Sequence, residues 1–454
     1  MKKLFFSLLL ILGAGAFFTS CKDRSGDGYQ TVVDLALAND NLSILASALE
    51  RADLLTTLNG DGPFTVFAPT NDAFAALLTQ LGVSSLNDIP VDQLRAILLN
   101  HVVSGNRRSG DLATGYYSTL SPGLNSSNLS VYVDKSAGVK INGTANVTAA
   151  DVTANNGVVH VIDKVLTLPT IVNQALNNPN FSTLVAALTR PDLGVDYVAI
   201  LSGNTPYTVF APTNAAFQAL LQQLGASSLN DIPAATLNAV LQNHVVSGQQ
   251  RSSELVTGYV STLSTGPDNS KISLFVNLAN NAVKVNDAGV AVADVMATNG
   301  VVHAIDKVML PANVVNHALN NPNFSTLVAA LTRADLGVDY VSILSGTGPF
   351  TGFAPTNAAF TALLTELGVS SLNDIPAATL NAVLQYHVVA GANVRSTQLT
   401  EGQQVTSFQG GKFTVTLNDG PKIKDAKDRI ANIIATDVQG SNGVVHAIDK
   451  VILP

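Results

Sequence analysis

Several residue types and motifs are scarce or missing in this chain of 454 residues, which has one cysteine, no tryptophan and 12% charged residues. A single cysteine excludes an intrachain disulfide, a CxxC redox pair and a cysteine-rich zinc module. The low charge content excludes a highly charged disordered chain, and the net charge of −8 argues against nucleic acid as a partner. The GxSxG, HExxH, GxGxxG and Walker motifs are also missing, so we expect no enzyme, no cofactor and no metal site.

Long hydrophobic runs are equally scarce, and the one that stands out lies near the N-terminus, at residues 4–18. Its fifteen residues fall short of the roughly 20 that a membrane-spanning helix needs. A run of this length behind two lysines is typical of the hydrophobic region of a secretory signal peptide. We therefore expect residues 1–20 to be a signal peptide, and we expect no transmembrane helix in the rest of the chain.

The single cysteine, Cys21, directly follows this run. Together with residues 18–20 it resembles the lipobox of bacterial lipoproteins, and the resemblance implies that Cys21 becomes the lipid-bearing first residue after cleavage. Residues 21–30 are polar and read as a lipidated tether. Lys22 favours the outer membrane under familiar sorting rules, which would allow exposure at the cell surface. The alternative is an ordinary signal peptide followed by an incidental cysteine.

Three internal repeats follow at a spacing of 143 residues, as the recurrence of two motifs shows. The first motif, Phe-Ala-Pro-Thr-Asn, begins at Phe67, Phe210 and Phe353. The second, Asn-Gly-Val-Val-His, begins at Asn156, Asn299 and Asn442. A repeat of this length can bury a core of its own. The sequence therefore predicts three domains at residues 27–168, 169–311 and 312–454, joined by short proline-containing junctions into a semi-rigid rod.

Within the second repeat, helical periodicity comes first and strand-like alternation comes later. Apolar residues at helical spacing predict helices over 181–188, over 214–224 with Gly225 as the stop, and after Pro233. Short alternating runs predict strands over 207–210, within 260–292 and over 301–305. This order favours the α+β fold class over an alternating parallel sheet.

The two motifs resemble those of the fasciclin-like domain family. The first has the form T-V-F-A-P-T-N-x-A-F and starts at Thr65, Thr208 and Thr351, with Gly352 replacing valine in the third copy. The second has the form N-G-V-[VI]-H-x-I-D-x-V-L and occurs in all three repeats, with Met309 and Ile452 in place of the final leucine in the second and third copies. The resemblance covers nearly the whole chain after residue 30. It implies three tandem domains, each a β-sandwich wedge flanked by helices, and a role in cell-surface or extracellular adhesion.

The resemblance also implies candidate binding residues. A Tyr-His pair takes part in receptor binding in some animal members, and it is intact here only as Tyr386-His387, because the other repeats have Asn100-His101 and Asn243-His244. An Asp-Ile pair nine residues before the second-motif histidine becomes an Asp-Val pair in this chain. Its three copies are Asp151-Val152, Asp294-Val295 and Asp437-Val438. We expect the third repeat, which holds Tyr386-His387, to be the most competent to bind a ligand.

Several repeated polar residues have two interpretations. His101, His244 and His387 lie on apolar helical faces, and His160, His303 and His446 alternate with valine in a strand. These histidines are either satisfied core residues or groups for binding or pH sensing. The Thr-Asn pair after each first-motif proline either caps a helix or contacts a ligand. The Asp-Lys pair near the end of each second motif, at Asp163-Lys164, Asp306-Lys307 and Asp449-Lys450, is either a surface or turn element or a catalytic dyad, and we expect the former.

Taken together, the sequence predicts a lipid-anchored adhesion or matrix-interaction protein that uses tandem weak binding modules. Its expected partners are a surface protein or polysaccharide, and the membrane through Cys21. The alternatives are a carbohydrate-binding envelope protein and a hydrolase, because a pair of carboxylates can hydrolyse sugars without a local motif. The oligomeric state stays open.

Overall fold

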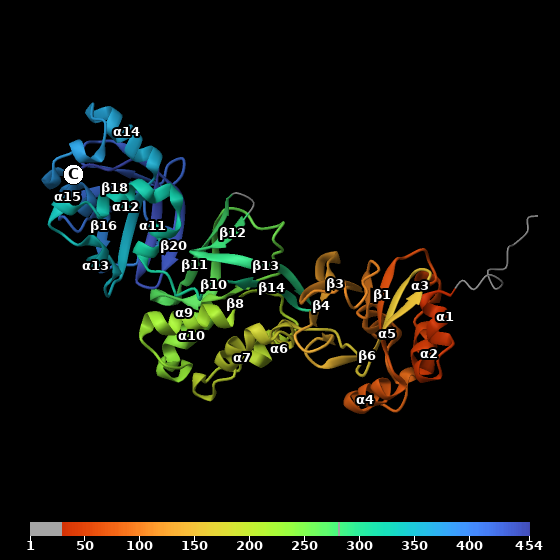
Figure 1. Ribbon diagram of the computed structural model, residues 1–454. Helices are drawn as coiled ribbons and strands as arrows, with labels where there is room; N and C mark the ends of the chain where they lie inside the picture. Colours follow the sequence, from red (N-terminus) through yellow and green to blue (C-terminus); the bar gives the residue numbers. More distant parts are fainter. Residues whose placement is uncertain (1–29, 280–281) are drawn as a thin grey trace, which may run out of the picture.

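A computed structural model describes residues 30–279 and 282–454, which form three domains in a row (Figure 1). The expected signal peptide, Cys21 and most of the expected tether lie outside the described residues. No helix in the described part of the chain has both the length and the hydropathy to cross a membrane. The expectation of an α+β fold is confirmed, because each domain combines a layer of helices with a seven-stranded arrangement.

The first domain begins with helices, and most of its strands follow. Its α-helices are α1 (Val32–Leu37), α2 (Ser43–Arg51), α3 (Leu55–Leu58), α4 (Asn71–Leu81) and α5 (Val91–Leu99). Its strands are β1 (Phe64–Pro69), β2 (Val102–Ser104), β3 (Gly115–Pro122), β4 (Asn128–Asp134), β5 (Lys140–Ile141), β6 (Ala145–Ala154) and β7 (Gly157–Ile162).

The second domain repeats this order. Its α-helices are α6 (Ile171–Asn177), α7 (Ser182–Leu188), α8 (Tyr197–Ser202), α9 (Asn214–Leu224) and α10 (Ala234–Asn243). Its strands are β8 (Tyr207–Pro212), β9 (Val245–Ser247), β10 (Gly258–Thr265), β11 (Lys271–Ala279), β12 (Ala282–Val285), β13 (Ala288–Ala297) and β14 (Gly300–Ile305).

The third domain has the same helices but shorter strands in its middle part. Its α-helices are α11 (Val314–Asn320), α12 (Ser325–Leu331), α13 (Tyr340–Ser345), α14 (Asn357–Leu367) and α15 (Ala377–Tyr386). Its strands are β15 (Phe350–Pro355), β16 (Val388–Ala390), β17 (Gln404–Thr406), β18 (Lys412–Thr416), β19 (Lys422–Lys424), β20 (Ile430–Gly440) and β21 (Gly443–Ile448).

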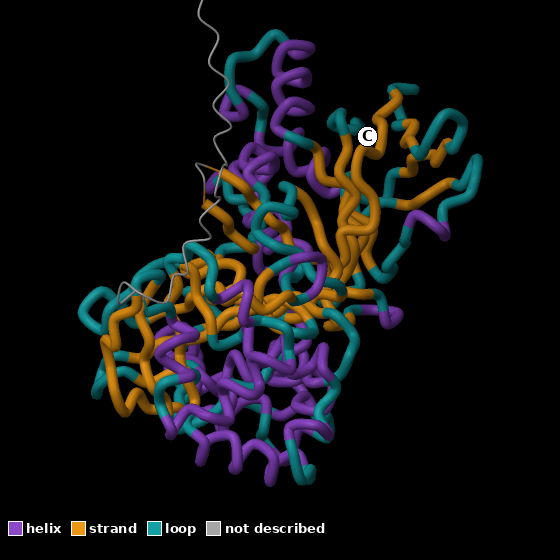
Figure 2. The backbone as a smooth tube through the Cα atoms, turned by 90° about the vertical axis from the view of Figure 1, so that its right-hand side faces the viewer, coloured by secondary structure: helices purple, strands orange, loops and turns teal. Residues whose placement is uncertain are grey.

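In every domain the strand of the first motif pairs in parallel with the strand of the second motif. In the first domain, β1 pairs in parallel with β7 and antiparallel with β2, and the seven strands close into a ring. Register shifts in β3 between Ser118 and Pro122, and in β6 between Val147 and Val152, bend this ring into two sheets, as a β-sandwich requires. In Figure 2 helices and strands occupy separate regions, with the helices gathered beside the strands.

The Thr-Asn pairs cap helices, which agrees with the capping interpretation. The hydroxyl oxygens of Thr70, Thr213 and Thr356 accept hydrogen bonds from backbone N–H groups three residues later, at 3.3 Å in each case. The amide of Asn71 donates to the Asp40 carbonyl and the Ser43 hydroxyl and so joins α4 to α2. Gly82, Gly225 and Gly368 end the following helices in the left-handed conformation, with φ of 68°, 65° and 67°.

Neighbouring domains are joined by two equivalent interfaces. Strand β4 of the first domain lies against β13 of the second, and β11 of the second lies against β20 of the third. At the first interface the Met296 amide donates to the Ser130 hydroxyl at 2.9 Å, and at the second the Gln439 amide donates to the Ser273 hydroxyl at 3.1 Å. These buried contacts hold the three domains in one repeating arrangement.

Candidate functional site

The Tyr386-His387 pair lies inside the third domain, at the end of α15. The Tyr386 ring has no exposed surface, its hydroxyl donates to the Lys412 carbonyl at 2.6 Å, and it packs edge-on against Phe413. His387 is also buried. In this arrangement neither ring offers surface to a ligand, and both link the helix to the strands around it. Neither side chain is therefore exposed for the direct ligand contact that was expected of this pair.

His101, His244 and His387 form the same buried clamp in the three domains. Each Nδ1 donates to the carbonyl four residues earlier at 2.7 Å. Each Nε2 accepts from a backbone N–H after the last strand, at distances of 2.8, 2.9 and 3.1 Å. Burial lowers the pKa of each imidazole to about 4. These three histidines are core residues whose two ring nitrogens are both hydrogen-bonded, which agrees with the first of the two interpretations.

The strand histidines belong to a second repeated network that includes serine and aspartate. In the first domain the His160 Nε2 donates to the Arg107 carbonyl at 3.0 Å, while Nδ1 accepts from the Asp151 amide at 3.3 Å. The Asp151 carboxylate accepts from the hydroxyl and the amide of Ser109, and these two bonds lower its pKa. The other domains use Ser252, Asp294 and His303, and Ser396, Asp437 and His446.

This network contains the residue types of a hydrolytic triad but not its geometry. A catalytic serine must donate to the imidazole that removes its proton. Here Ser109 donates to Asp151 instead, and both ring nitrogens of His160 are bound by backbone groups. The groups therefore brace a bulge of β6, where Asp151 has a φ of 61°, and they leave no base to activate a nucleophile.

The valines of the three Asp-Val pairs differ sharply in exposure. Val152 is 37% exposed, whereas Val295 and Val438 are 1% and 3% exposed. The difference follows from the domain interfaces, because each of the two buried valines lies in a core that the preceding domain completes with a tyrosine, Tyr116 or Tyr259. In the second and third domains the predicted binding position is thus occupied by a neighbouring domain, and Val152 is the copy that stays open.

The two tyrosines are domain-interface positions that the sequence analysis missed. Tyr116 and Tyr259 accept hydrogen bonds from Asn178 and Asn321 of the next domain, at 3.2 and 3.1 Å. In the third domain, Gln403 follows the glycine that corresponds to the ones before these tyrosines. The sequence does contain a signal for these tyrosines, since a Gly-Tyr pair occurs at the same position of the first two repeats and is absent from that position of the third.

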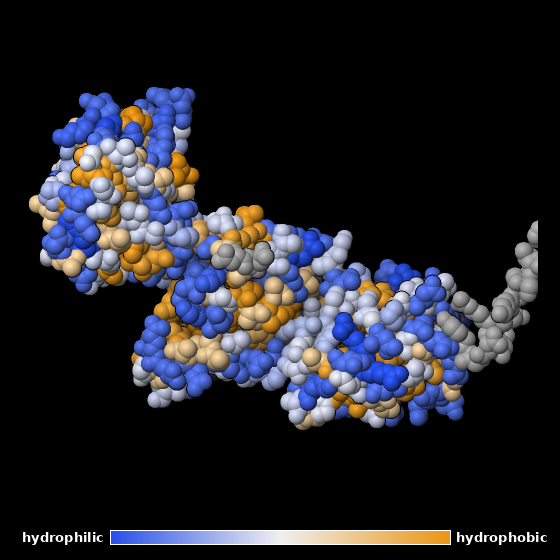
Figure 3. Space-filling view, turned by 45° about the horizontal axis from the view of Figure 1, so that its top comes forward, coloured by the Kyte–Doolittle hydropathy of each residue, from blue (hydrophilic) through white to orange (hydrophobic). Residues whose placement is uncertain are grey.

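A cleft lined by both polar and apolar residues lies where the second domain meets the start of the third. Its volume is about 490 Å³, and amide side chains of Gln223, Asn286, Asn316 and Asn320 line it together with Leu319. Asp287 and Lys307 form an ion pair of 3.2 Å in its wall. Figure 3 shows that the face of the protein in view carries small hydrophobic patches between hydrophilic areas. Among the described residues, no group of His, Cys, Asp and Glu is placed to hold a metal ion.

Comparison with known proteins agrees with the repeated architecture. Residues 40–169, 179–311 and 322–454 each match the model of the Fasciclin domain. The chain is 26% identical to periostin of Homo sapiens over 93% of its own length and 47% of periostin. It is 29% identical to transforming growth factor-beta-induced protein ig-h3 of Sus scrofa over 91% of its length and 56% of that protein. The chain thus spans about half the length of these relatives.

Smaller proteins also match a single repeat. Protein sll1483 of Synechocystis is 41% identical over 32% of this chain and 76% of its own length. Among solved structures, a FAS1 domain pair from the insect cell adhesion molecule Fasciclin I matches with 21% identity. That match covers 58% of this chain and 92% of the pair, with a TM-score of 0.36.

Proposed function

Since the three repeats show that this chain belongs to the fasciclin domain family, we propose that it is an adhesion protein of the cell surface or extracellular matrix. The observation that carries the proposal is the fixed tandem arrangement of three domains that leaves Val152 open on the first. An open apolar position beside a braced carboxylate, Asp151, provides a preformed surface for a partner. The ordered Ser–Asp–His network supports a binding role rather than catalysis.

The exposed Val152 and the neighbouring Asp151 together form the Val152 surface, and a substitution there is the most direct test of the adhesion proposal. Replacing Val152 with aspartate places a charge on the open face, and we expect attachment of cells displaying the protein to fall by at least half. Val152 lies on the surface, so the fold is expected to survive the change. Attachment to a matrix-coated surface and to neighbouring cells is the measurement.

Val256→Asp is the matched control, because Val256 is 72% exposed in the second domain and belongs to neither interface. It should leave attachment unchanged. Equal attachment by the Val152→Asp and wild-type proteins would contradict the assignment of this face. Unchanged attachment after deletion of the whole gene would contradict adhesion itself. Treating the target surface with protease or with glycosidases then distinguishes a protein ligand from a polysaccharide.

Anchoring through a lipid on Cys21 is the second element of the proposal, supported by the lipobox-like residues 18–21. We expect the wild-type protein to partition with membranes and the Cys21→Ala protein to be released, because two or more acyl chains are needed for stable attachment. Immunoblots after protease treatment of intact cells are the measurement. Cleavage from outside supports a surface location, whereas protection until the outer membrane is opened would contradict it.

The alternative, a carbohydrate-binding envelope protein, is favoured by the amide-rich cleft between the second and third domains. Amide side chains supply paired donors and acceptors that suit sugar hydroxyls. The attachment assay also distinguishes binding at this cleft from binding at the Val152 surface. Soluble glycans that block attachment of the wild-type protein, but not of an Asn316→Ala protein, would favour the cleft over the Val152 surface.

A further inference from the structure

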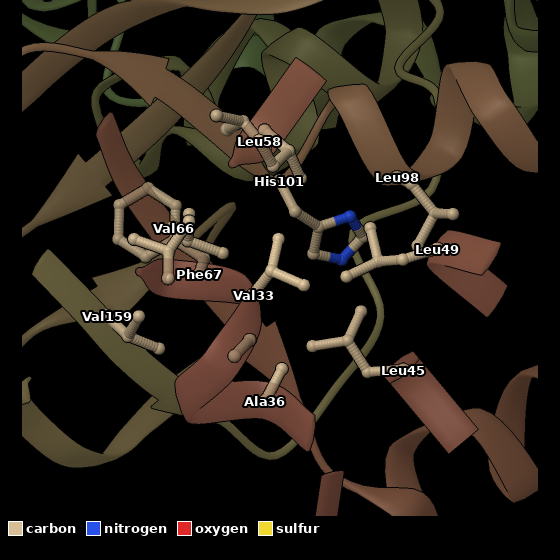
Figure 4. A pocket seen from close by; sticks show the side chains of 13 residues that line it. Val33, Ala36, Leu45, Leu49, Leu58, Val66, Phe67, Leu98, His101 and Val159 are labelled. Carbon is tan, nitrogen blue, oxygen red and sulfur yellow. The ribbon is translucent and has the colours of Figure 1, made fainter. Parts of the chain in front are cut away.

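The cores of the first and third domains contain equivalent cavities between the helices and the sheet. In the first domain the cavity has a volume of about 20 Å³. Figure 4 shows Val33, Val66, Leu98 and His101 around it. In the third domain the corresponding cavity has a volume of about 60 Å³. The same place in the fold is therefore about three times larger in the third domain.

A single wall residue distinguishes the two cavities. At twelve of the thirteen positions that line the first cavity, the third domain has the same residue type, so that Val33 corresponds to Val315 and Leu58 to Leu344. The exception is Val66, which corresponds to Gly352. The second domain also has valine there, Val209. The space that a valine side chain fills in two domains is left empty in the third.

The larger cavity is also more open to solvent. Leu344 is 8% exposed where Leu58 is 2% exposed, and Ala354 is 6% exposed where Ala68 is 1% exposed. Val388 and Gly352 are half-buried, whereas their counterparts in the first domain are buried. The wall of the third-domain cavity at Gly352 and Val388 is therefore partly exposed to solvent.

The cavity is apolar and offers no hydrogen bond to an occupant. Its one polar side chain is His387, whose two ring nitrogens are already bound to the Val383 carbonyl and the Ile452 amide. An apolar cavity without polar partners does not hold ordered water and takes apolar guests instead. Its occupant must therefore be an uncharged hydrocarbon group of small size.

We propose that the third domain binds a small apolar group, such as a hydrocarbon or the end of an alkyl chain, in the cavity that Gly352 opens between α11–α13 and the sheet. The first two domains, with Val66 and Val209 at this position, lack room for that guest. The site is independent of the proposed adhesion surface, which lies on the first domain.

The test uses the full three-domain chain with labelled valine and leucine methyl groups. Xenon and decanoate are the probes, and methyl NMR shifts are the readout. We expect both to shift methyl signals of Val315, Leu344 and Val445, and the affinity to fall at least about tenfold in Gly352→Val, because the added side chain takes the volume of the guest. Shifts with xenon alone would indicate a small hydrocarbon, and shifts with decanoate as well would indicate an alkyl chain.

A matched pair of variants makes the test decisive. Val66→Gly should create a second site, with new shifts at Val33, Leu58 and Val159 of the first domain. Gly352→Val is expected to fold, because the β-carbon built at Gly352 meets only the Val445 Cγ2, at 3.9 Å. Equal binding by Gly352→Val and wild type, or no shift with either probe in the wild-type protein, would overturn the proposal.

Discussion

Replacing Gly300 with alanine is expected to destabilise the second domain by about 3–5 kcal/mol, because a side chain cannot fit where two strands meet. Gly300 lies opposite Tyr207 in the parallel pair β8–β14. A β-carbon at Gly300 would overlap the Tyr207 carbonyl oxygen and lie 2.8 Å from the Cδ1 of Ile171. Both neighbours belong to the packed framework, so relief requires separating β8 from β14. For a domain of this size the expected loss corresponds to a melting temperature lower by about 10 °C or more.

Gly258→Ala is the matched control for this prediction. Gly258 has a φ of 159°, close to the 149° of Gly300, but a β-carbon there meets no atom within 4 Å. The control should cost about 1 kcal/mol, which reflects the backbone conformation alone. Scanning calorimetry of the full chain, with hydrogen exchange to assign the transition to the second domain, is the measurement. Equal losses in the two variants would show that backbone conformation rather than the approach of β8 to β14 requires glycine.

The sequence predicted the longer elements of each domain, because their periodicity is local. The helix with Gly225 as its stop is α9, and the strand expected over 301–305 is β14 (Gly300–Ile305). The short helices α6 and α8 were missed, whereas α7, which also has seven residues, was predicted, because its apolar pattern begins at Phe181 and continues to Leu188. The parallel pairing of β8 with β14 was also missed, because about ninety residues separate the two strands.

The candidate site was less predictable than the fold, since exposure depends on neighbouring domains. The three Asp-Val pairs look equivalent in the sequence, yet a preceding domain buries Val295 and Val438 and leaves Val152 open. Likewise, the residue types of Asn299 and Gly300 alone predict only a tight turn. The structure adds that the Asn299 side chain accepts from the Ile171 amide and donates to the carbonyls of Leu201 and Gly203. Such long-range bonds leave no local pattern.

Acid is expected to weaken the third domain through His317, which lies at its interface with the second. His317 is fully buried, its Nε2 donates to the Gln439 carbonyl at 2.9 Å, and the Tyr259 ring lies edge-on at 5.8 Å. Its Nδ1 has no hydrogen-bond partner among the described residues. Burial lowers the pKa of this imidazole from 6.5 to about 4. The folded state therefore holds His317 neutral over a range in which the unfolded chain is protonated.

The direction of the pH effect follows from this difference. Between pH 6.5 and pH 4 the unfolded chain binds the extra proton, so the free energy of unfolding falls as the pH falls. At about 1.4 kcal/mol for each pKa unit, His317 alone should cost the third domain about 2–3 kcal/mol between pH 7 and pH 4.5. His101, His244 and His387 act in the same direction within their own domains.

The equivalent interface supplies the variant that isolates His317. Gln174 occupies the corresponding position between the first and second domains, where its amide donates to the carbonyls of Ser130 and Met296, at 2.8 Å in both bonds. A glutamine does not titrate, so His317→Gln should preserve the interface. It should also reduce the loss of unfolding free energy between pH 7 and pH 4.5 by about 2–3 kcal/mol. Guanidinium unfolding of both proteins at pH 7 and pH 4.5 measures the difference. An equal loss in both would mean that the protonation of His317 is not coupled to the stability of this interface. The expected difference would instead assign the acid sensitivity of the second junction to His317, the residue that replaces the glutamine of the first.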